Sequence, residues 1–201
     1  VTNSIARRIY DDLSWNKAEH RRLDDADFTL SGTWSTITSG LFDGAQDTYH
    51  KSIVANSYAE IVIPDGNENF AIVCRTFENF GKLDITLNGG SIASYGDAQI
   101  NLAKAKNSAG DIGNPFKTIE YTGLPSGANT IRIAKENNTD EVQVFGVFYW
   151  TGNTMIVHNV AHGGHTLKNL LDDHLQADLV DNNFDAVLFE LTLMNECSKS
   201  P

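Results

Sequence analysis

Three histidines, a glycine loop and an asparagine near the C-terminal end carry the residue types most suited to chemistry. His158, His162 and His165 surround Gly164, the second of two adjacent glycines, and Asn195 follows some thirty residues later. Clustered histidines are typical of zinc sites, usually with a further ligand. This cluster runs from an expected strand through a loop into an expected helix, so its members need not converge, and we expect no metal or cofactor. Glycine N–H and asparagine amide groups are donors suited to a developing negative charge.

A βαβ unit would position these donors. Met155–Val160 is a short, largely apolar run typical of a strand. Ala186–Leu191 is apolar except for Glu190, which is typical of a parallel strand buried on both faces. The leucines between them are spaced for one face of a helix. They are Leu167, Leu170, Leu171, Leu175 and Leu179. The glycine loop and the asparagine then fall at the ends of strands.

The middle of the chain consists of short apolar or alternating runs separated by turn residues such as Pro64–Asn67 and Asn88–Gly90. Many short strands at this spacing predict a β-sandwich or jelly roll. The spacing of Val142, Val144, Val147 and Tyr149 suits a strand with one irregularity. The expected strands are Phe28–Thr36, Thr48–Ala55, Tyr58–Ile63, Phe70–Phe77, Leu83–Leu87, Ala98–Ala103, Lys117–Tyr121, Thr130–Ala134 and Val142–Trp150.

The N-terminal residues predict one helix followed by a connection. Ile5, Ile9 and Leu13 form a stripe at a spacing of four residues within Ser4–Leu13. Ser4 stands at the start of this pattern, where serine is also favoured simply as a helix cap. The stretch Trp15–Asp27 is polar and charged without a clean period, so we interpret it as a connection.

Composition excludes several classes of partner. The 201 residues carry a net charge of −11, which disfavours nucleic acid and anionic membrane surfaces, since both require a positive footprint. No apolar run reaches the roughly 18 residues of a membrane helix. The two cysteines, Cys74 and Cys197, do not form a disulfide framework, and Cys74 lies in an apolar run where a core role is expected.

The two ends of the chain together resemble the SGNH (GDSL-like) hydrolases. Thr2–Ile5, directly before a helical pattern, resembles the first block of the family, whose serine is the nucleophile. Asn159–Thr166 resembles the second block, which supplies a glycine N–H to the oxyanion hole, and Leu193–Glu196 resembles the third, which supplies an asparagine amide. The resemblance implies acyl transfer in which Ser4 is the nucleophile and Gly164 and Asn195 are oxyanion donors.

The chain departs from the family pattern at several positions. Thr2, Asn3 and Leu193 stand where the family has glycine, aspartate and glycine. The family's last block, Asp-x-x-His, supplies the catalytic base, and no histidine follows Asn195 in the 201 residues. The resemblance therefore implies a hydrolase part that stops before its base, and a chain with little activity of its own.

The middle of the chain resembles the galactose-binding-like jelly rolls attached to such esterases. The likeness rests on Asp43-Gly44, Tyr49–Val54, Lys82–Gly89 and Val142–Trp150. The whole chain would then be a jelly roll inserted into an incomplete, flavodoxin-like α/β hydrolase part. Residues 1–27 would supply its N-terminal helix, residues 28–150 the carbohydrate-binding-like sandwich, and residues 151–201 the βαβ unit.

Two functions follow from these resemblances. The first is a carbohydrate-binding module within an SGNH-type esterase or deacetylase that acts on acylated polysaccharide. The alternative is a non-enzymatic glycan-binding or adhesion module, for example of a phage tail, with the hydrolase remnant as scaffold. Either function would place the protein outside the cell or on a virion. A histidine–metal enzyme is a third hypothesis, which the cluster's spread over three elements disfavours.

Aromatic residues are the expected sugar-contacting groups of the sandwich. Most aromatics in a sandwich belong to the core, and Trp150, at the end of an apolar strand, is expected there. Trp34 and Tyr95 are the candidates for exposed rings that contact the C–H face of a sugar. Asp43 and Asp47 could ligate calcium through oxygen, although solvated acids are the simpler interpretation.

Overall fold

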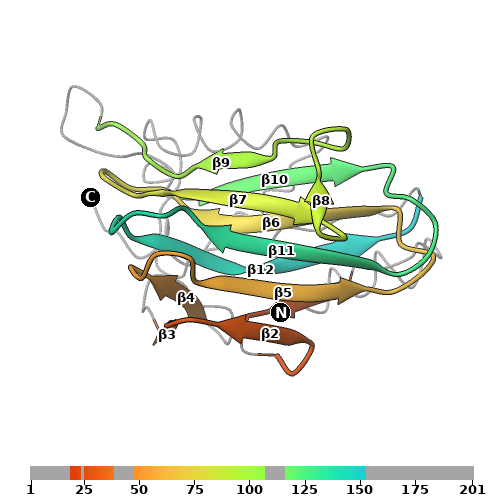
Figure 1. Ribbon diagram of the computed structural model, residues 1–201, viewed down its shortest axis with the longest axis horizontal. Helices are drawn as coiled ribbons and strands as arrows, with labels where there is room; N and C mark the ends of the chain where they lie inside the picture. Colours follow the sequence, from red (N-terminus) through yellow and green to blue (C-terminus); the bar gives the residue numbers. More distant parts are fainter. Residues whose placement is uncertain (1–18, 24, 39–47, 107–115, 153–201) are drawn as a thin grey trace, which may run out of the picture.

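Two antiparallel β-sheets packed face to face make up the described part of the protein (Figure 1). The computed structural model describes residues 19–23, 25–38, 48–106 and 116–152. Twelve strands and no helix occur in these ranges, and none of the described residues belongs to a helix able to span a membrane. The mainly-β jelly-roll sandwich predicted from the sequence is confirmed. The α/β part predicted around it lies outside the described residues.

Each sheet has six strands. The first, termed the β6–β12 sheet, has the order β10-β6-β12-β4-β3, and β1 also pairs with β12. Its strands are β1 (Glu19–Arg22), β3 (Ser35–Thr38), β4 (Thr48–Ser52), β6 (Asn69–Arg75), β10 (Phe116–Thr122) and β12 (Val142–Trp150). The second, termed the β5–β11 sheet, has the order β2-β5-β11-β7-β8, and β9 also pairs with β7. Its strands are β2 (Phe28–Ser31), β5 (Tyr58–Ile63), β7 (Lys82–Leu87), β8 (Gly90–Ser91), β9 (Gln99–Asn101) and β11 (Asn129–Lys135).

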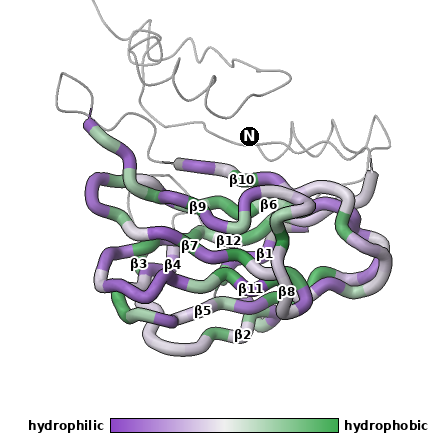
Figure 2. Tube along the Cα trace, turned by 45° about the horizontal axis from the view of Figure 1, so that its top comes forward, coloured by the Kyte–Doolittle hydropathy of each residue, from purple (hydrophilic) through white to green (hydrophobic). Residues whose placement is uncertain are grey.

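The core lies between the sheets and follows from the alternation of side chains along each strand. In β11, Ile131 and Ile133 are fully buried whereas Arg132 between them is exposed. Figure 2 shows the same alternation of hydrophobic and hydrophilic residues along β5, β7 and β11. In the other sheet, the rings of Phe70 and Tyr121 stack with centroids 4.4 Å apart and their planes 4° apart. Burial of these apolar side chains is the main force that holds the two sheets together.

Most expected strands are confirmed within a few residues, including the irregularity in Val142–Trp150. There the register of β12 against β6 shifts between Val144 and Gly146, which marks a β-bulge. The expected strand Phe28–Thr36 is instead two strands, β2 and β3, in different sheets. Gly32 lies at the break with φ 80, and a Cβ at this position would come within 2.4 Å of Ser57 Oγ. Only glycine allows this crossing between the sheets.

The interpretation of Trp15–Asp27 as a connection was wrong for part of its length. Glu19–Arg22 forms β1, which pairs with β12 from Glu19↔Tyr149 to Arg22↔Gly146. Its four residues are charged or polar, so they show no apolar period. Arg21 forms ion pairs instead, with its Nε 2.6 Å from Asp27 Oδ2 and its Nη1 3.1 Å from Glu19 Oε2. Backbone pairing to an apolar neighbour, rather than side-chain burial, holds this strand in the sheet.

Four links between strands gather at one end of the sandwich, on the left in Figure 1. They connect β2 to β3, β4 to β5, β6 to β7, and β11 to β12. We call this end the β11–β12 end. Binding residues concentrate in loops placed on a rigid scaffold, which makes this end a favourable place for a site.

Candidate functional site

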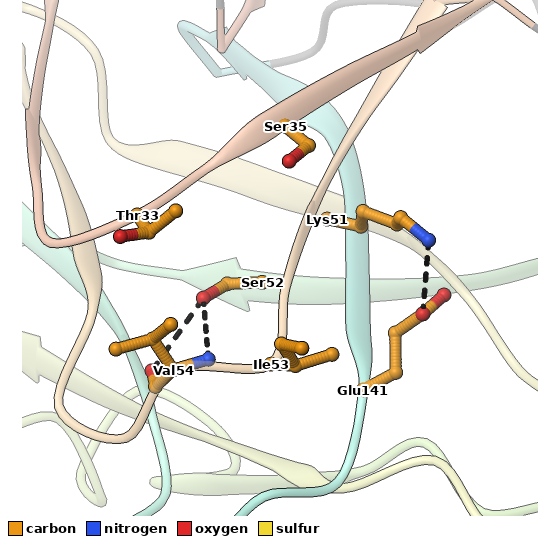
Figure 3. A pocket seen from close by; sticks show the side chains of 7 residues that line it. All are labelled: Thr33, Ser35, Lys51, Ser52, Ile53, Val54 and Glu141. Atoms are coloured by element: carbon orange, nitrogen blue, oxygen red, sulfur yellow. Dashed lines mark hydrogen bonds and ion pairs between the residues drawn. The ribbon is translucent and has the colours of Figure 1, made fainter.

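A hollow of about 150 Å³ lies at the β11–β12 end, among residues from β3, β4 and the links beside them (Figure 3). Its lining combines hydroxyl groups, one ammonium, one carboxylate and two aliphatic side chains. The lining residues are Thr33, Ser35, Lys51, Ser52, Ile53, Val54 and Glu141.

The charged side of the hollow is an ion pair between neighbouring strands. Ser35 pairs with Lys51, and Gln143 pairs with Lys51 on the other side, so Lys51 lies between β3 and β12. Its Nζ donates a 3.2 Å hydrogen bond to Glu141 Oε2, and Gln143 Nε2 donates to Glu141 Oε1. The Lys51 side chain remains 36% exposed, so its ammonium can donate to a ligand as well.

The apolar side of the hollow is the turn that follows β4. The Val54 N–H donates to Ser52 Oγ over 3.2 Å, which fixes the turn, and Ser52 itself is buried. Ile53 and Val54 are then forced outward and remain 57% and 42% exposed. Figure 3 shows Thr33 and Ser35 across the hollow from these two side chains. An aliphatic patch beside hydroxyl groups suits a ligand that is itself apolar on one side and polar on the other.

A buried lysine organises the link that carries Glu141. Lys135, the last residue of β11, is only 2% exposed. Its Nζ donates to Glu136 O at 3.2 Å, Asn138 O at 2.5 Å and Asn138 Oδ1 at 2.7 Å. Asn138 Oδ1 also accepts from Asp140 N at 3.1 Å. Burial lowers the pKa of Lys135, and the carboxylates of Asp140 and Glu136 act in the opposite direction.

The sequence carries a signal for the buried Lys135. Ile131 and Ile133 precede it at alternate positions of the strand, so a third inward-facing residue was due at 135. A lysine there must find oxygen acceptors, because an unpaired buried charge is very costly. The ion pair of Lys51 and Glu141 had no such signal, since the two residues stand far apart in the sequence.

Trp34 and Tyr95, the predicted sugar-contacting residues, lie at opposite ends of the sandwich. Trp34 follows β2 at the β11–β12 end, between the lining residues Thr33 and Ser35. Its Nε1–H is shared between Ser31 O and Tyr58 O, each at 3.2 Å, and its half-buried ring packs against the core. Tyr95 lies in the link between β8 and β9, is also half-buried, and packs against the same core. Neither ring is fully exposed, and the two rings do not belong to one site.

The remaining predicted site residues lie outside the described ranges. These are Ser4, Gly164 and Asn195 of the proposed acyl-transfer site, His158, His162 and His165 of the histidine cluster, and Asp43 and Asp47. Within the residues that the structure does describe, no three His, Cys, Asp or Glu side chains are grouped to hold a metal ion.

No protein-family model matches the sequence, and no curated protein matches it either. Solved structures with a similar arrangement include a family 35 carbohydrate binding module from Clostridium thermocellum, at 15% identity and TM-score 0.45 over 65% of this chain and 97% of that one. A family two carbohydrate esterase from Cellvibrio japonicus matches at 13% identity and TM-score 0.44 over 71% of this chain and 36% of the esterase. The Agl-KA catalytic domain matches at 17% identity and TM-score 0.47, over 84% of this chain and 35% of that domain. The chain thus spans about a third of the length of the last two proteins, and the likeness concerns the fold alone.

Proposed function

We propose that the β-sandwich is a glycan-binding module and that the hollow at the β11–β12 end takes one acylated unit of a polysaccharide. The observation that carries this proposal is the amphipathic lining. The exposed Ile53 and Val54 offer a surface for the methyl group of an acyl substituent or the C–H face of a sugar. Lys51 and the hydroxyls of Thr33 and Ser35 lie across from them, within reach of the carbonyl and the ring hydroxyls of the same unit.

The size of the hollow supports a polymer rather than a small ligand. Sites that enclose small molecules usually measure about 300–1,000 Å³. A hollow of about 150 Å³ suits one unit of a chain whose neighbouring units lie along the surface. Affinity per unit is then modest, as expected of a module that adds avidity to a larger protein.

Within that larger function, we propose that the module serves an SGNH-type carbohydrate esterase located outside the cell or on a virion. The support is the order of three sequence blocks, with Ser4 as nucleophile and Gly164 and Asn195 as oxyanion donors. The 201 residues hold no histidine after Asn195 to act as the base. We therefore expect this chain alone to hydrolyse p-nitrophenyl acetate no faster than its Ser4→Ala variant. Turnover by the chain that Ser4→Ala abolishes would show that a base is present after all.

Glycan binding is tested by affinity electrophoresis in gels containing a neutral O-acetylated polysaccharide or the same polymer after alkaline deacetylation. We expect retardation that is stronger in the acetylated gel. Lys51→Met should weaken binding about tenfold, because a charge-assisted hydrogen bond contributes roughly 1.5–3 kcal/mol. Ile53→Ser should remove the preference for the acetylated polymer.

The matched control is Glu60→Gln. Glu60 forms an ion pair with Arg132 at 2.9 Å on the outer face of the other sheet. The substitution therefore removes an ion pair comparable to that of Lys51 and Glu141, but away from the hollow. Equal retardation of Lys51→Met, Glu60→Gln and the unaltered chain would exclude the hollow as the binding site. Binding without any deacetylation by a longer form of the protein would favour the adhesion-module alternative.

A further inference from the structure

A row of four polar residues leads out of the hollow across the β6–β12 sheet. Ser35 pairs with Lys51, and Lys51 pairs with Gln143. Gln143 pairs in turn with Arg75, so the row crosses β3, β4, β12 and β6. Residues directly opposite in antiparallel strands share one face, and both neighbours of Gln143 in β12 belong to the core, so the row faces outward. With strands about 4.8 Å apart, the row spans roughly 14 Å. Ser35 and Lys51 line the hollow, and Arg75 lies beyond it.

Hydrogen bonds connect the two ends of this row. The amide of Gln143 is buried, and its Nε2 donates to Glu141 Oε1. The other carboxylate oxygen of Glu141 accepts from Lys51 Nζ in the hollow. On the opposite side of the amide, Arg75 Nη1 donates to Gln143 Oε1 over 3.4 Å. The ammonium of the hollow and the guanidinium on β6 are therefore held at a fixed separation, which lowers the cost of ordering a site that uses both.

The guanidinium of Arg75 keeps unused donors. Within the described ranges, its only hydrogen bond is the long one to Gln143, and no described carboxylate pairs with it. A guanidinium has five N–H donors, so most of them are left for a ligand. The Cζ of Arg75 lies 5.9 Å from the ring centroid of Tyr49 and 5.7 Å from that of Phe77. These two rings hold the cation in place without using its hydrogen-bonding capacity.

Phe77 is the exposed aromatic ring beside this guanidinium. It follows β6 at the β11–β12 end of the sandwich, and it remains 39% exposed. Its backbone N–H donates to Leu102 O at 3.1 Å. Its ring lies 5.7 Å, between centroids, from the ring of Phe80, which packs against the core. The fold thus holds an aromatic surface open to solvent next to free donors, and this combination suits a sugar, which is apolar on its C–H face and polar at its hydroxyls.

We propose that Phe77 and Arg75 form a second subsite, which takes a further unit of the polysaccharide whose acylated unit occupies the hollow. This inference rests on the proposed glycan binding. The C–H face of the sugar packs on Phe77, and its hydroxyl or acyl carbonyl oxygens accept hydrogen bonds from Arg75. The occupant belongs to the same glycan chain because the row from Lys51 to Arg75 is continuous with the hollow. The bound polysaccharide therefore runs across β4, β12 and β6.

The second subsite is tested in the full chain with two probes, the neutral O-acetylated polysaccharide and disaccharides cut from it. A disaccharide in the hollow does not reach Phe77, whereas the polymer does. Phe77→Ser and Arg75→Met should each weaken retardation by the polymer about fivefold, since each removes one contact of modest strength. Both variants should bind the disaccharide as the unaltered chain does, as measured by ¹⁵N NMR titration. Lys51→Met, which alters the hollow, should weaken binding of both probes.

Phe77→Trp separates a lost contact from damage to the fold, because its larger ring should strengthen retardation by the polymer. The matched control is Val62→Ser, which removes an exposed apolar side chain from the outer face of the other sheet and should change neither measurement. Polymer binding that is unchanged in all three variants of Phe77 and Arg75, but weakened in Lys51→Met, would overturn the second subsite alone. No retardation of the unaltered chain would overturn the hollow and the second subsite together.

Discussion

Cys74 shows how a single buried group sets the response of this fold to alkaline pH. Complete burial raises the pKa of the Cys74 thiol to about 12, from an ordinary value of 9.0, and nearby Lys117 offsets only part of this effect. The thiol therefore stays protonated in the folded protein while the unfolded chain loses the proton. Because the pKa of the thiol is raised by folding, the stability of the fold is unaffected below pH 9 and decreases as pH rises from there.

We predict that the free energy of unfolding falls by up to roughly 1.4 kcal/mol per pH unit between about pH 9 and pH 12. This slope corresponds to the one proton that Cys74 loses on unfolding in that range. Urea denaturation across this range measures the slope. Cys74→Ala lowers stability at pH 7 by leaving a cavity. Its free energy of unfolding should nevertheless fall less steeply with pH, because the variant lacks the proton that Cys74 loses on unfolding. An unchanged slope in Cys74→Ala would assign the loss to other groups, Tyr121 first, since burial also raises its pKa.

At the scale of elements, we predict that Lys135 holds the link between β11 and β12, and with it Glu141, in place. Lys135→Met removes the donor to Glu136 O and Asn138 O, at a cost of about 1–3 kcal/mol for the unsatisfied acceptors. Hydrogen exchange in residues 136–141 should accelerate at least tenfold, and retardation by the acetylated polysaccharide should weaken. Lys117→Met, which changes a partly exposed lysine of β10, is the matched control and should leave both readouts unchanged. Faster exchange throughout the sandwich would instead mean global destabilisation.

Some strands could be predicted from the sequence and others could not. Tyr58–Ile63 and Val142–Trp150 were predicted with their observed bounds, because alternation and apolar content report burial directly. β1 was missed because its charged side chains carry no such pattern, and the crossing at Gly32 was missed because it depends on the approach of Ser57. The hollow was missed for a related reason. Trp34 lies at the same end of the sandwich as the hollow, but the pairing that brings Lys51 to Glu141 exists only after folding.

At the scale of the whole molecule, the net charge of −11 bears on which polysaccharide the protein can bind. The hollow contributes one cation and one anion, so it does not offset the negative field of the whole chain. A polyanionic glycan would be repelled at low ionic strength, whereas a neutral acylated glycan would not be affected.

We therefore predict that retardation by a neutral O-acetylated polysaccharide changes less than twofold between about 20 and 300 mM NaCl, since the Debye length falls from tens of ångströms to a few over such a range. A carboxylated polysaccharide should be bound weakly at the low salt concentration and somewhat better as salt screens the repulsion. Affinity electrophoresis at the two salt concentrations measures both trends. Strong binding of the carboxylated polymer that is lost on adding salt would show instead that Lys51 recognises an acidic group, and that the local ammonium outweighs the charge of the whole molecule.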